Sequence, residues 1–176
     1  VEAFYFMAGV MKHAREMSLI TNPLVNSYKR IVPGYEAPVD VTWSPANRSP
    51  LIRVPAARGS GTRLEFRSPD PAANPYLALA VSLAAGLEGI RGKLTPGKGS
   101  STNQYEMAEG EKKEAGIMML PRDLKEALDI FEKSDFIRKT LGDHIFTKYY
   151  KAKKREWESY QKFVSQWEID EYLYKF

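Results

Sequence analysis

A helical spacing of apolar side chains opens the chain and predicts a helix over residues 1–14. Prolines and glycines break this pattern between residues 21 and 38, which predicts a loop. Three short runs bounded by turn-rich segments follow, at residues 39–43, 51–54 and 62–67, and polar and apolar residues alternate in the last of them. Alternation with a period of two is typical of strands with one buried face, so these runs predict a sheet.

A strong helix-start signal follows the third run, in the segment "SPDPAANPYLALAVSLAAGLEGI". Asp70 is a suitable N-cap and Pro71 a suitable first helical residue, and the helix is expected to end near Gly92. Small residues at Ala80, Ala84 and Ala85 would let another element approach this helix closely.

From residue 121 onward the apolar spacing is again helical. It predicts helices over about residues 123–133 and 136–141, and a long helix from about Gly142. One apolar stripe defines the long helix: Phe146, Tyr149, Trp157, Tyr160, Val164 and Trp167. The pattern therefore predicts an α+β fold. Its expected parts are a sheet and site at residues 1–97, a mobile loop at 98–120 and a helical C-terminal part at 121–176.

Composition narrows the class of protein. The 176 residues are 43% hydrophobic and 27% charged, which is a globular balance. The absence of cysteine excludes disulfides and cysteine-ligated metal, and is typical of a reducing compartment such as the cytoplasm. No apolar run approaches the roughly 20 residues of a membrane span, which argues against a membrane partner.

The net charge of +4 says little about binding partners by itself. The basic and aromatic stretch "KYYKAKKREWESY" could suggest nucleic acid. On a helix, however, its lysines lie largely off the aromatic stripe, which favours a solvated face and no nucleic-acid partner. His13 is expected to have a helix-terminal or surface role and His144 a capping or surface role, and neither has a second ligand at metal-binding spacing.

Arginines are the strongest chemical signal. Five of them fall on or beside the predicted strands: Arg48, Arg53, Arg58, Arg63 and Arg67. Alternation places Arg63, Glu65 and Arg67 on one face of a strand. Two interpretations fit: a structural network of ion pairs, or a site for a phosphate- or carboxylate-bearing ligand with a divalent cation on Glu65. Exposed ion pairs contribute only about 0–1 kcal/mol each, but the residues alone leave both interpretations open.

Three long motifs occur in one order: "NSYKRIVPGYEAP", "NRSPLIRVPAARGSGTRLEFR" and "DPAANPYLALAVSLAAGLEGI". In them the chain resembles bacterial type I glutamine synthetase, the glutamate–ammonia ligase. The resemblance implies the C-terminal part of the catalytic domain. It also implies the glutamine synthetase/guanido kinase catalytic fold, with an antiparallel sheet portion and a helical C-terminal region.

The same resemblance implies ATP-dependent joining of ammonia to glutamate through γ-glutamyl phosphate, with Mg²⁺ or Mn²⁺ as cofactor. The resemblance further implies a cytoplasmic homo-oligomer, because members of this family form stacked rings, and some of them bind a regulatory protein partner. Such phosphoryl transfer needs positioning and cationic charge more than covalent help from the protein.

The resemblance implies roles for the residues of this chain that occupy the family's motif positions. Glutamate binding is implied for Arg30, Glu36, Arg48 and Arg67. ATP binding is implied for Arg48, Arg53, Arg58 and Arg63. Glu65 would bind the metal, Arg48 would stabilise the transferred phosphoryl, and Glu36 would be the catalytic flap residue that shields the acyl phosphate and helps accept a proton.

Other features of the family are missing from the matched segment. Its other metal-binding glutamates, its nucleotide-site histidines and its N-terminal β-domain would precede Val1, so we expect this piece alone to be inactive.

Tyr105 falls where some members carry an adenylylated tyrosine, but its surroundings lack their proline-rich segment, and the "RGSGT" loop is more similar to that of feedback-inhibited members.

Two alternatives stay open. One is a relative that ligates glutamate to a polyamine or another amine. The other is a non-catalytic homologue that acts as a scaffold or regulator, against which the intact Glu36, Arg48, Glu65 and Arg67 argue.

Overall fold

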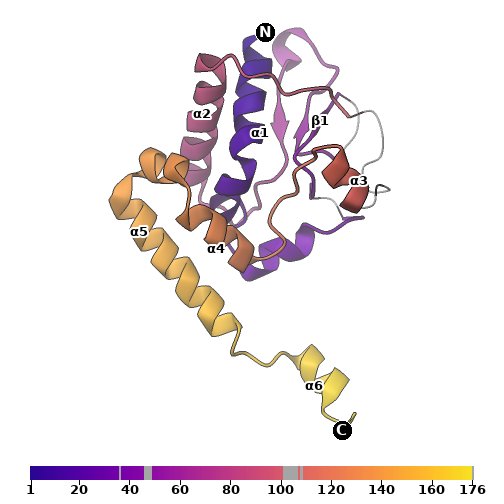
Figure 1. The fold of residues 1–176 in the computed structure, drawn as a ribbon, viewed down its shortest axis with the longest axis vertical. Coiled ribbons are helices and arrows are strands. Elements are labelled where there is room, and N and C mark those ends of the chain that lie inside the picture. The colour runs from indigo at the N-terminus through magenta and orange to yellow at the C-terminus, as the bar shows by residue number, and fades with distance from the viewer. Residues whose placement is uncertain (36, 46–48, 101–106, 108, 176) are drawn as a thin grey trace.

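The computed structural model describes residues 1–35, 37–45, 49–100, 107 and 109–175. Two helices, α1 (Glu2–Thr21) and α2 (Pro75–Arg91), lie side by side and form one layer (Figure 1). A small sheet and its loops lie on the other side of α1 (Figure 1). This arrangement of helices around a small sheet confirms the predicted α+β class.

Helix α1 continues well beyond the predicted end at residue 14. Its last turns bury Met17, Leu19 and Ile20 completely, and these contacts extend the helix up to the proline-containing segment that follows. Because neighbouring elements surround these turns, their apolar residues do not show the one-sided spacing on which the shorter prediction depended.

The sheet contains three strands of two residues each, β1 (Trp43–Ser44), β2 (Ile52–Arg53) and β3 (Glu65–Phe66), in the order β1-β2-β3. β2 and β3 are antiparallel as expected, but β1 and β2 are parallel, so the sheet is mixed. The strands are shorter than predicted.

The segment before β1 pairs with distant residues. Asp40 forms an isolated antiparallel bridge with Met119, and Leu120 N–H donates to the Val39 carbonyl at 2.8 Å. The end of the predicted 98–120 loop is therefore tied to the sheet side of the molecule, and part of that loop forms helix α3 (Glu109–Glu114).

The predicted cap of α2 is wrong by four residues. Asn74, not Asp70, is the N-cap, and its Oδ1 accepts hydrogen bonds from the N–H groups of Tyr76 and Leu77. Pro75, not Pro71, is the first helical residue. The other end is as predicted, with Gly92 as the C-cap.

The C-terminal part is helical as predicted: α4 (Leu124–Glu132), α5 (Asp135–Tyr160) and α6 (Gln166–Tyr172). Gly142 interrupts α5 with a φ of 75°, at the predicted junction of two helices. The long helix stops at Tyr160, so Val164 lies beyond it and Trp167 lies on α6, both exposed. No helix among the described residues is long and apolar enough to cross a membrane.

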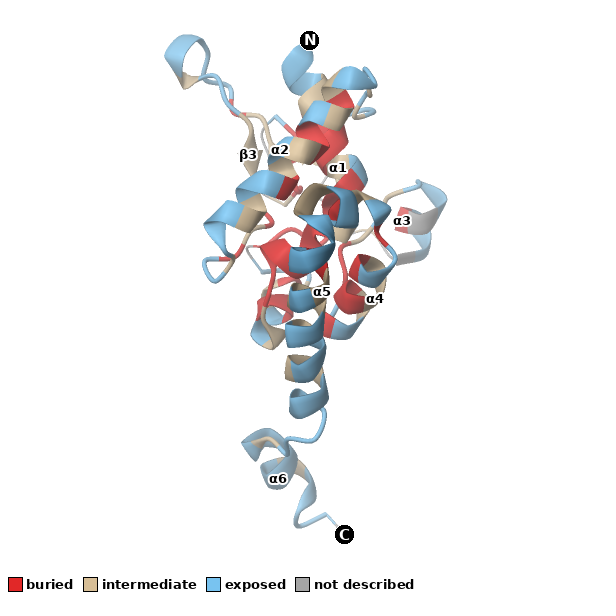
Figure 2. Cartoon of the chain, turned by 90° about the vertical axis from the view of Figure 1, so that its left-hand side faces the viewer, coloured by how far each residue is buried: buried red, intermediate tan, exposed pale blue. Residues whose placement is uncertain are grey.

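Two short 3₁₀ helices lie in the segments predicted as loops. They are η1 (Val25–Arg30), which follows α1, and η2 (Gly59–Gly61), which precedes β3. The hydrophobic core lies between α1, α2, α4 and the first half of α5, and it reaches under the sheet at Leu51 and Ile52. Burial falls away along the second half of α5 and through α6 (Figure 2).

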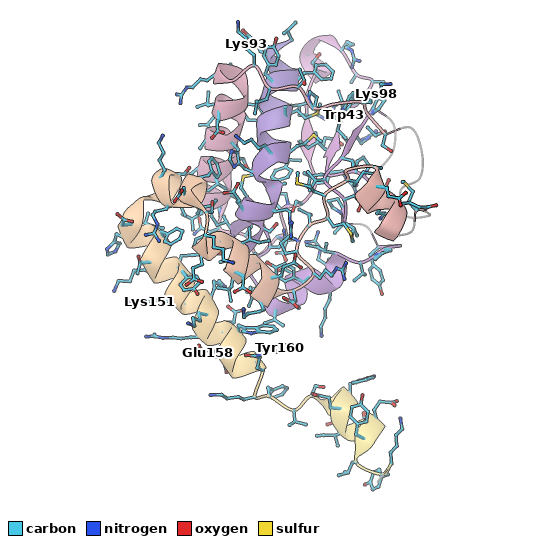
Figure 3. The ribbon with its side chains drawn as sticks, in the orientation of Figure 1. Trp43, Lys93, Lys98, Lys151, Glu158 and Tyr160 are labelled. Atoms are coloured by element: carbon cyan, nitrogen blue, oxygen red, sulfur yellow. The ribbon has the colours of Figure 1, made fainter. Side chains whose placement is uncertain are left out.

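The basic and aromatic stretch of α5 is largely a solvated helix face. Lys151, Glu158 and Tyr160 lie along its outer half, away from the core (Figure 3). Tyr149, on the other face, packs against the core and donates from its hydroxyl to the Leu19 carbonyl at 2.9 Å.

Candidate functional site

Two strands bring a carboxylate and two guanidinium groups together. Arg53 on β2 is the register partner of Glu65 on β3, and Arg53 Nη1 donates to Glu65 Oε2 at 3.0 Å. Arg63 stands two residues earlier on the same side of the strand, and its Nε donates to Glu65 Oε1 at 2.9 Å. The predicted alternation is thus confirmed for Arg63 and Glu65, while Leu64 and Phe66 pack against the core.

The pair of arginines holds Glu65 in its ionised form. The hydrogen bond from Arg53 lowers the pKa of the Glu65 carboxyl, burial opposes this, and the hydrogen bond from Arg63 lowers it further. Because two cations face one anion, this group keeps one positive charge in excess. Such an edge can attract an anionic ligand and at the same time offer an ionised carboxylate.

Two guanidinium nitrogens, one in this cluster and one on Arg30, lack hydrogen-bond acceptors among the described residues. Arg53 Nε and Arg30 Nη1 are both buried, and neither has a hydrogen-bond partner among the described residues. A buried donor without an acceptor costs about 1–3 kcal/mol, and more when it carries charge. An anionic ligand would supply these acceptors, so the pattern favours a binding site over a closed network of ion pairs.

Arg67 lies just after β3, where its N–H donates to the Leu51 carbonyl at 2.9 Å. Its Nη1 reaches the Pro50 carbonyl at 3.5 Å, so the side chain stays beside β2. Arg58 behaves differently. Its Nη1 donates to the carbonyls of Pro55 and Ala57 within its own loop, at 2.8 and 3.0 Å.

Arg30 ends η1 and faces the segment between β3 and α2. Its Nη1 lies 3.7 Å from Asp70 Oδ2. Three of the implied residues cannot be placed in this way, because Glu36, Arg48 and Tyr105 lie outside the described residues.

The fit to a divalent metal rests on Glu65. Its carboxylate is the hard oxygen ligand that Mg²⁺ and Mn²⁺ prefer. Within the described part of the chain, no group of three or more His, Asp or Glu side chains could hold a metal ion. Among the described residues, Glu65 would be the one to hold such a metal, and the remaining ligands would have to come from outside them.

Sequence reasoning misjudged two polar residues near the core. His13, expected on the surface, is buried in the middle of the longer α1, where its ring stacks on Phe136 with centroids 3.8 Å apart. Asp70, expected as a helix cap, faces Arg30. The signal for Asp70 was the proline directly after it, which favours a turn as much as a helix start. His144 is exposed, as predicted.

Comparison with known proteins identifies the family. Residues 2–172 match the family described as "Glutamine synthetase, catalytic domain". Glutamine synthetase of Methanosarcina mazei is 53% identical over 172 residues, which cover 98% of this chain and 38% of the relative. Glutamine synthetase of Thermus thermophilus is 52% identical over 171 residues, covering 97% and 38%.

Solved structures agree in fold. Two structures of GmaS, one titled as an ADP complex and one as the apo form, superpose with TM-scores of 0.83 and 0.81. Each is 34% identical to this chain and matches 98% of it, and the matched part is 39% and 38% of the GmaS chain, respectively. The chain thus spans 38% of the length of these two curated relatives. On this match of nearly every residue, the chain belongs to the glutamine synthetase catalytic-domain family.

Proposed function

We propose that this chain serves ATP-dependent ligation of ammonia to glutamate, giving glutamine through γ-glutamyl phosphate. The observation that carries the proposal is the arrangement of Arg53 on β2, Glu65 on β3 and Arg63 just before β3, with an excess positive charge and a buried donor, Arg53 Nε, without a partner among the described residues. These residues occupy the motif positions at which the family binds ATP phosphates and metal. Identities of 53% and 52% to glutamine synthetases support the same activity.

Each residue receives a role from its place on the sheet edge. Arg53 and Arg63 bind the phosphates of ATP, with Arg58 as a weaker contributor because it is turned to its own loop. Glu65 binds Mg²⁺ or Mn²⁺. The metal supplies charge neutralisation between the nucleotide phosphates when it is bound. One solved GmaS structure is titled as an ADP complex, which supports nucleotide binding by a protein of this fold.

Arg30 and Arg67 bind the glutamate substrate through its carboxylates. A guanidinium group suits this task because its planar fork binds a carboxylate with two parallel hydrogen bonds. Both residues lie at the same region of the fold, Arg30 facing the β3–α2 segment in which Arg67 stands. Glu36 and Arg48 are proposed as the catalytic residues on their motif positions alone.

Charge stabilisation is the chemical task of this part of the chain. As the γ-phosphoryl group moves to the glutamate carboxylate, the guanidinium groups stabilise negative charge on the phosphoryl oxygens. Arg48 acts at the transferred group, and Glu36 accepts a proton from ammonium as the amine displaces phosphate. Because the arginines are fixed by Glu65 and backbone carbonyls, little reorganisation is needed during transfer.

We further propose that the activity belongs to a homo-oligomeric protein in the cytoplasm whose length matches that of the relatives. The rest of that length supplies the other metal ligands and part of the site wall. Exposed aromatic residues of the C-terminal region, including Trp167, Tyr172 and Tyr174, suit contacts between subunits.

Replacing Glu65 tests the proposal. In the complete protein that carries this chain, Glu65→Ala should lower glutamine formation by at least about 100-fold, because Arg53 and Arg63 lose their partner and the metal loses a ligand. Glu158→Ala, a change of the same kind at an exposed position of α5, should keep activity within about twofold. Glutamine formed and phosphate released are the measurements. Near-normal turnover by Glu65→Ala would refute the metal role.

The amine is tested in the same assay. Ammonium and putrescine are supplied separately with glutamate and ATP, and phosphate release should depend on ammonium. Release with putrescine alone would instead establish an amine ligase of the same family. Absence of release with either amine would point to a non-catalytic homologue.

A further inference from the structure

A buried carboxylate lies against Arg30, one of the arginines proposed to bind glutamate. Asp70 Oδ2 is 3.7 Å from Arg30 Nη1, and the Asp70 side chain is 7% exposed whereas that of Arg30 is 40% exposed. The distance is too long for a hydrogen bond, and Nη1 has no other acceptor among the described residues. Asp70 therefore attracts the guanidinium group without occupying its donors.

Asp70 itself is held firmly. Its Oδ1 accepts a hydrogen bond from Ala72 N–H at 2.5 Å, and its own N–H donates to the Thr21 carbonyl at 2.9 Å. Pro71 restricts the backbone that follows. One carboxylate oxygen and the backbone are thus anchored, and the second oxygen lies on the side of Arg30.

Further hydrogen bonds connect the Asp70 segment to the end of α1. Asn22 is completely buried, and its Nδ2 donates to Ser68 Oγ and to Thr21 Oγ1, each at 3.0 Å. Ser68 follows Arg67 directly and precedes Asp70 by two residues. This buried polar network therefore fixes the segment that contains both Arg67 and Asp70.

We propose that Asp70 is a positioning residue for glutamate binding: its buried carboxylate orients the Arg30 guanidinium so that free donors face the substrate, and the Asn22–Ser68 contact keeps Asp70 in place. The substrate's identity rests on the proposed function, whereas the orienting contact does not. A fixed anion behind a guanidinium group also stabilises its charge while the substrate is absent.

The test removes the charge and keeps the turn. Asp70→Asn retains an oxygen acceptor for Ala72 N–H, and Asp70→Ser is a second variant with a shorter acceptor. The matched control is Asp129→Asn, which removes an equal charge from an exposed ion pair with Lys125 on α4. Crystal structures of the complete protein and each variant, without substrate, show the position of the Arg30 side chain.

The kinetic arm separates positioning from folding. Asp70→Asn should raise KM for glutamate about tenfold, with kcat and KM for ATP within about twofold, because binding energy is lost equally from ground and transition states. Asp129→Asn should leave all three parameters unchanged. A general loss of structure would move all three together and lower the melting temperature.

The outcomes are distinct. A displaced or disordered Arg30 with a raised KM for glutamate supports the proposal. An Arg30 side chain unmoved in both Asp70 variants overturns it, as does a displaced Arg30 with unchanged KM for glutamate. If Arg30 moves but the wild-type protein consumes no ATP with glutamate, the positioning contact is established and the proposed function fails instead.

Discussion

The ammonium group of Lys112 is almost wholly buried and lies 2.7 Å from Asp40 Oδ2, in an ion pair whose side chains are 4% and 3% exposed. Lys112 belongs to α3, and Asp40 belongs to the segment that pairs with Met119. The pair therefore fastens α3, a part of the predicted 98–120 loop, to the sheet side of the core. Burial of two charges is costly, but loss of one partner is more costly still.

Lys112→Met leaves Asp40 buried without its counter-charge, so the free energy of unfolding should fall by about 3–5 kcal/mol. The double variant Lys112→Met/Asp40→Leu removes both charges and should recover most of that loss. Lys125→Met, in an exposed pair with Asp129, should change stability by less than about 1 kcal/mol. Urea denaturation monitored by circular dichroism gives these values. Equal losses for both lysines would contradict a structural role for the buried pair.

His13 joins α1, α2 and the start of α5. Its Nδ1 lies 2.7 Å from Glu16 Oε1, its Nε2 lies 3.1 Å from Glu88 Oε1, and its ring stacks on Phe136. Glu16 also accepts a hydrogen bond from Ser134, the N-cap of α5. Burial by itself lowers the pKa of His13, but the hydrogen bonds and charges of Glu16 and Glu88 outweigh it, so the pKa is raised above 6.5.

A raised pKa means that the folded protein binds the His13 proton more tightly than the unfolded chain does. The resulting stability is fully present below the unfolded value near 6.5 and is lost as pH rises through the folded pKa. We expect the melting temperature of the wild type, relative to that of His13→Gln, to fall between pH 6 and pH 9. A difference that stays constant over that range would exclude a protonated His13. The carboxyls of Glu16 and Glu88 have lowered pKa values, so their contribution is lost only at acid pH, below about 4.5.

Helices α1 and α2 meet at glycines. A Cβ at Gly89 would stand 2.1 Å from the Tyr5 carbonyl oxygen, and one at Gly9 would stand 2.0 Å from the Ala85 carbonyl oxygen. Both clashes are with backbone, which cannot move without separating the helices. The predicted close approach to α2 is therefore confirmed, but glycines rather than the alanines make it possible. Ala85 is fully buried at the same contact.

Gly89→Ala should lower the free energy of unfolding by at least about 2 kcal/mol, because the added methyl group pushes α1 away from α2. Gly110→Ala is the matched control, since a Cβ at this exposed position of α3 meets nothing within 4 Å. It should stabilise the protein by up to about 1 kcal/mol through helix propensity. Chemical denaturation of both variants decides the point, and tolerance of Gly89→Ala would show that the helices can separate without loss.

The C-terminal helix stands apart from the rest of the molecule. α6 contains no buried residue, and Figures 1 and 2 show it beyond the end of α5, away from the core. Its own capping is local: Ser165 accepts a hydrogen bond from Glu168 N–H, and the Glu168 carboxylate accepts one from Ser165 N–H in return. Helix formation here thus depends on neighbouring residues in the sequence rather than on packing.

Removal of residues 163–176 should therefore shift the melting temperature of the chain by less than about 2 °C, because little apolar area leaves the core. The measurement is differential scanning calorimetry of the chain at low concentration. Removal of residues 146–176 is the control, because it deletes Phe146, which stacks on Phe131 with ring centroids 4.7 Å apart. That deletion should unfold the protein. A large loss on the shorter deletion would show that α6 contributes to the core.

Local sequence patterns predicted the structure correctly where neighbouring residues along the chain decide the conformation. The helical spacing of α4 and α5, the break at Gly142 and the end of α2 at Gly92 all depend on residues within a few positions. The alternation that pairs Arg63 with Glu65 is equally local, since it follows from the period of a strand. The motifs were also sufficient for the family, which the comparisons confirm.

Contacts between distant residues needed the tertiary structure. The extension of α1 to Thr21, the burial of His13, the parallel pairing of β1 with β2, and the approach of Asp70 to Arg30 each depend on contacts beyond the nearest neighbours in the sequence. Asp70 shows the reason. Its sequence neighbours favour a helix cap, but the Thr21 carbonyl and the Arg30 guanidinium group, brought beside it by the fold, set its contacts. Sequence periodicity records which residues share a face, whereas burial and hydrogen bonding depend on what the rest of the chain places against that face.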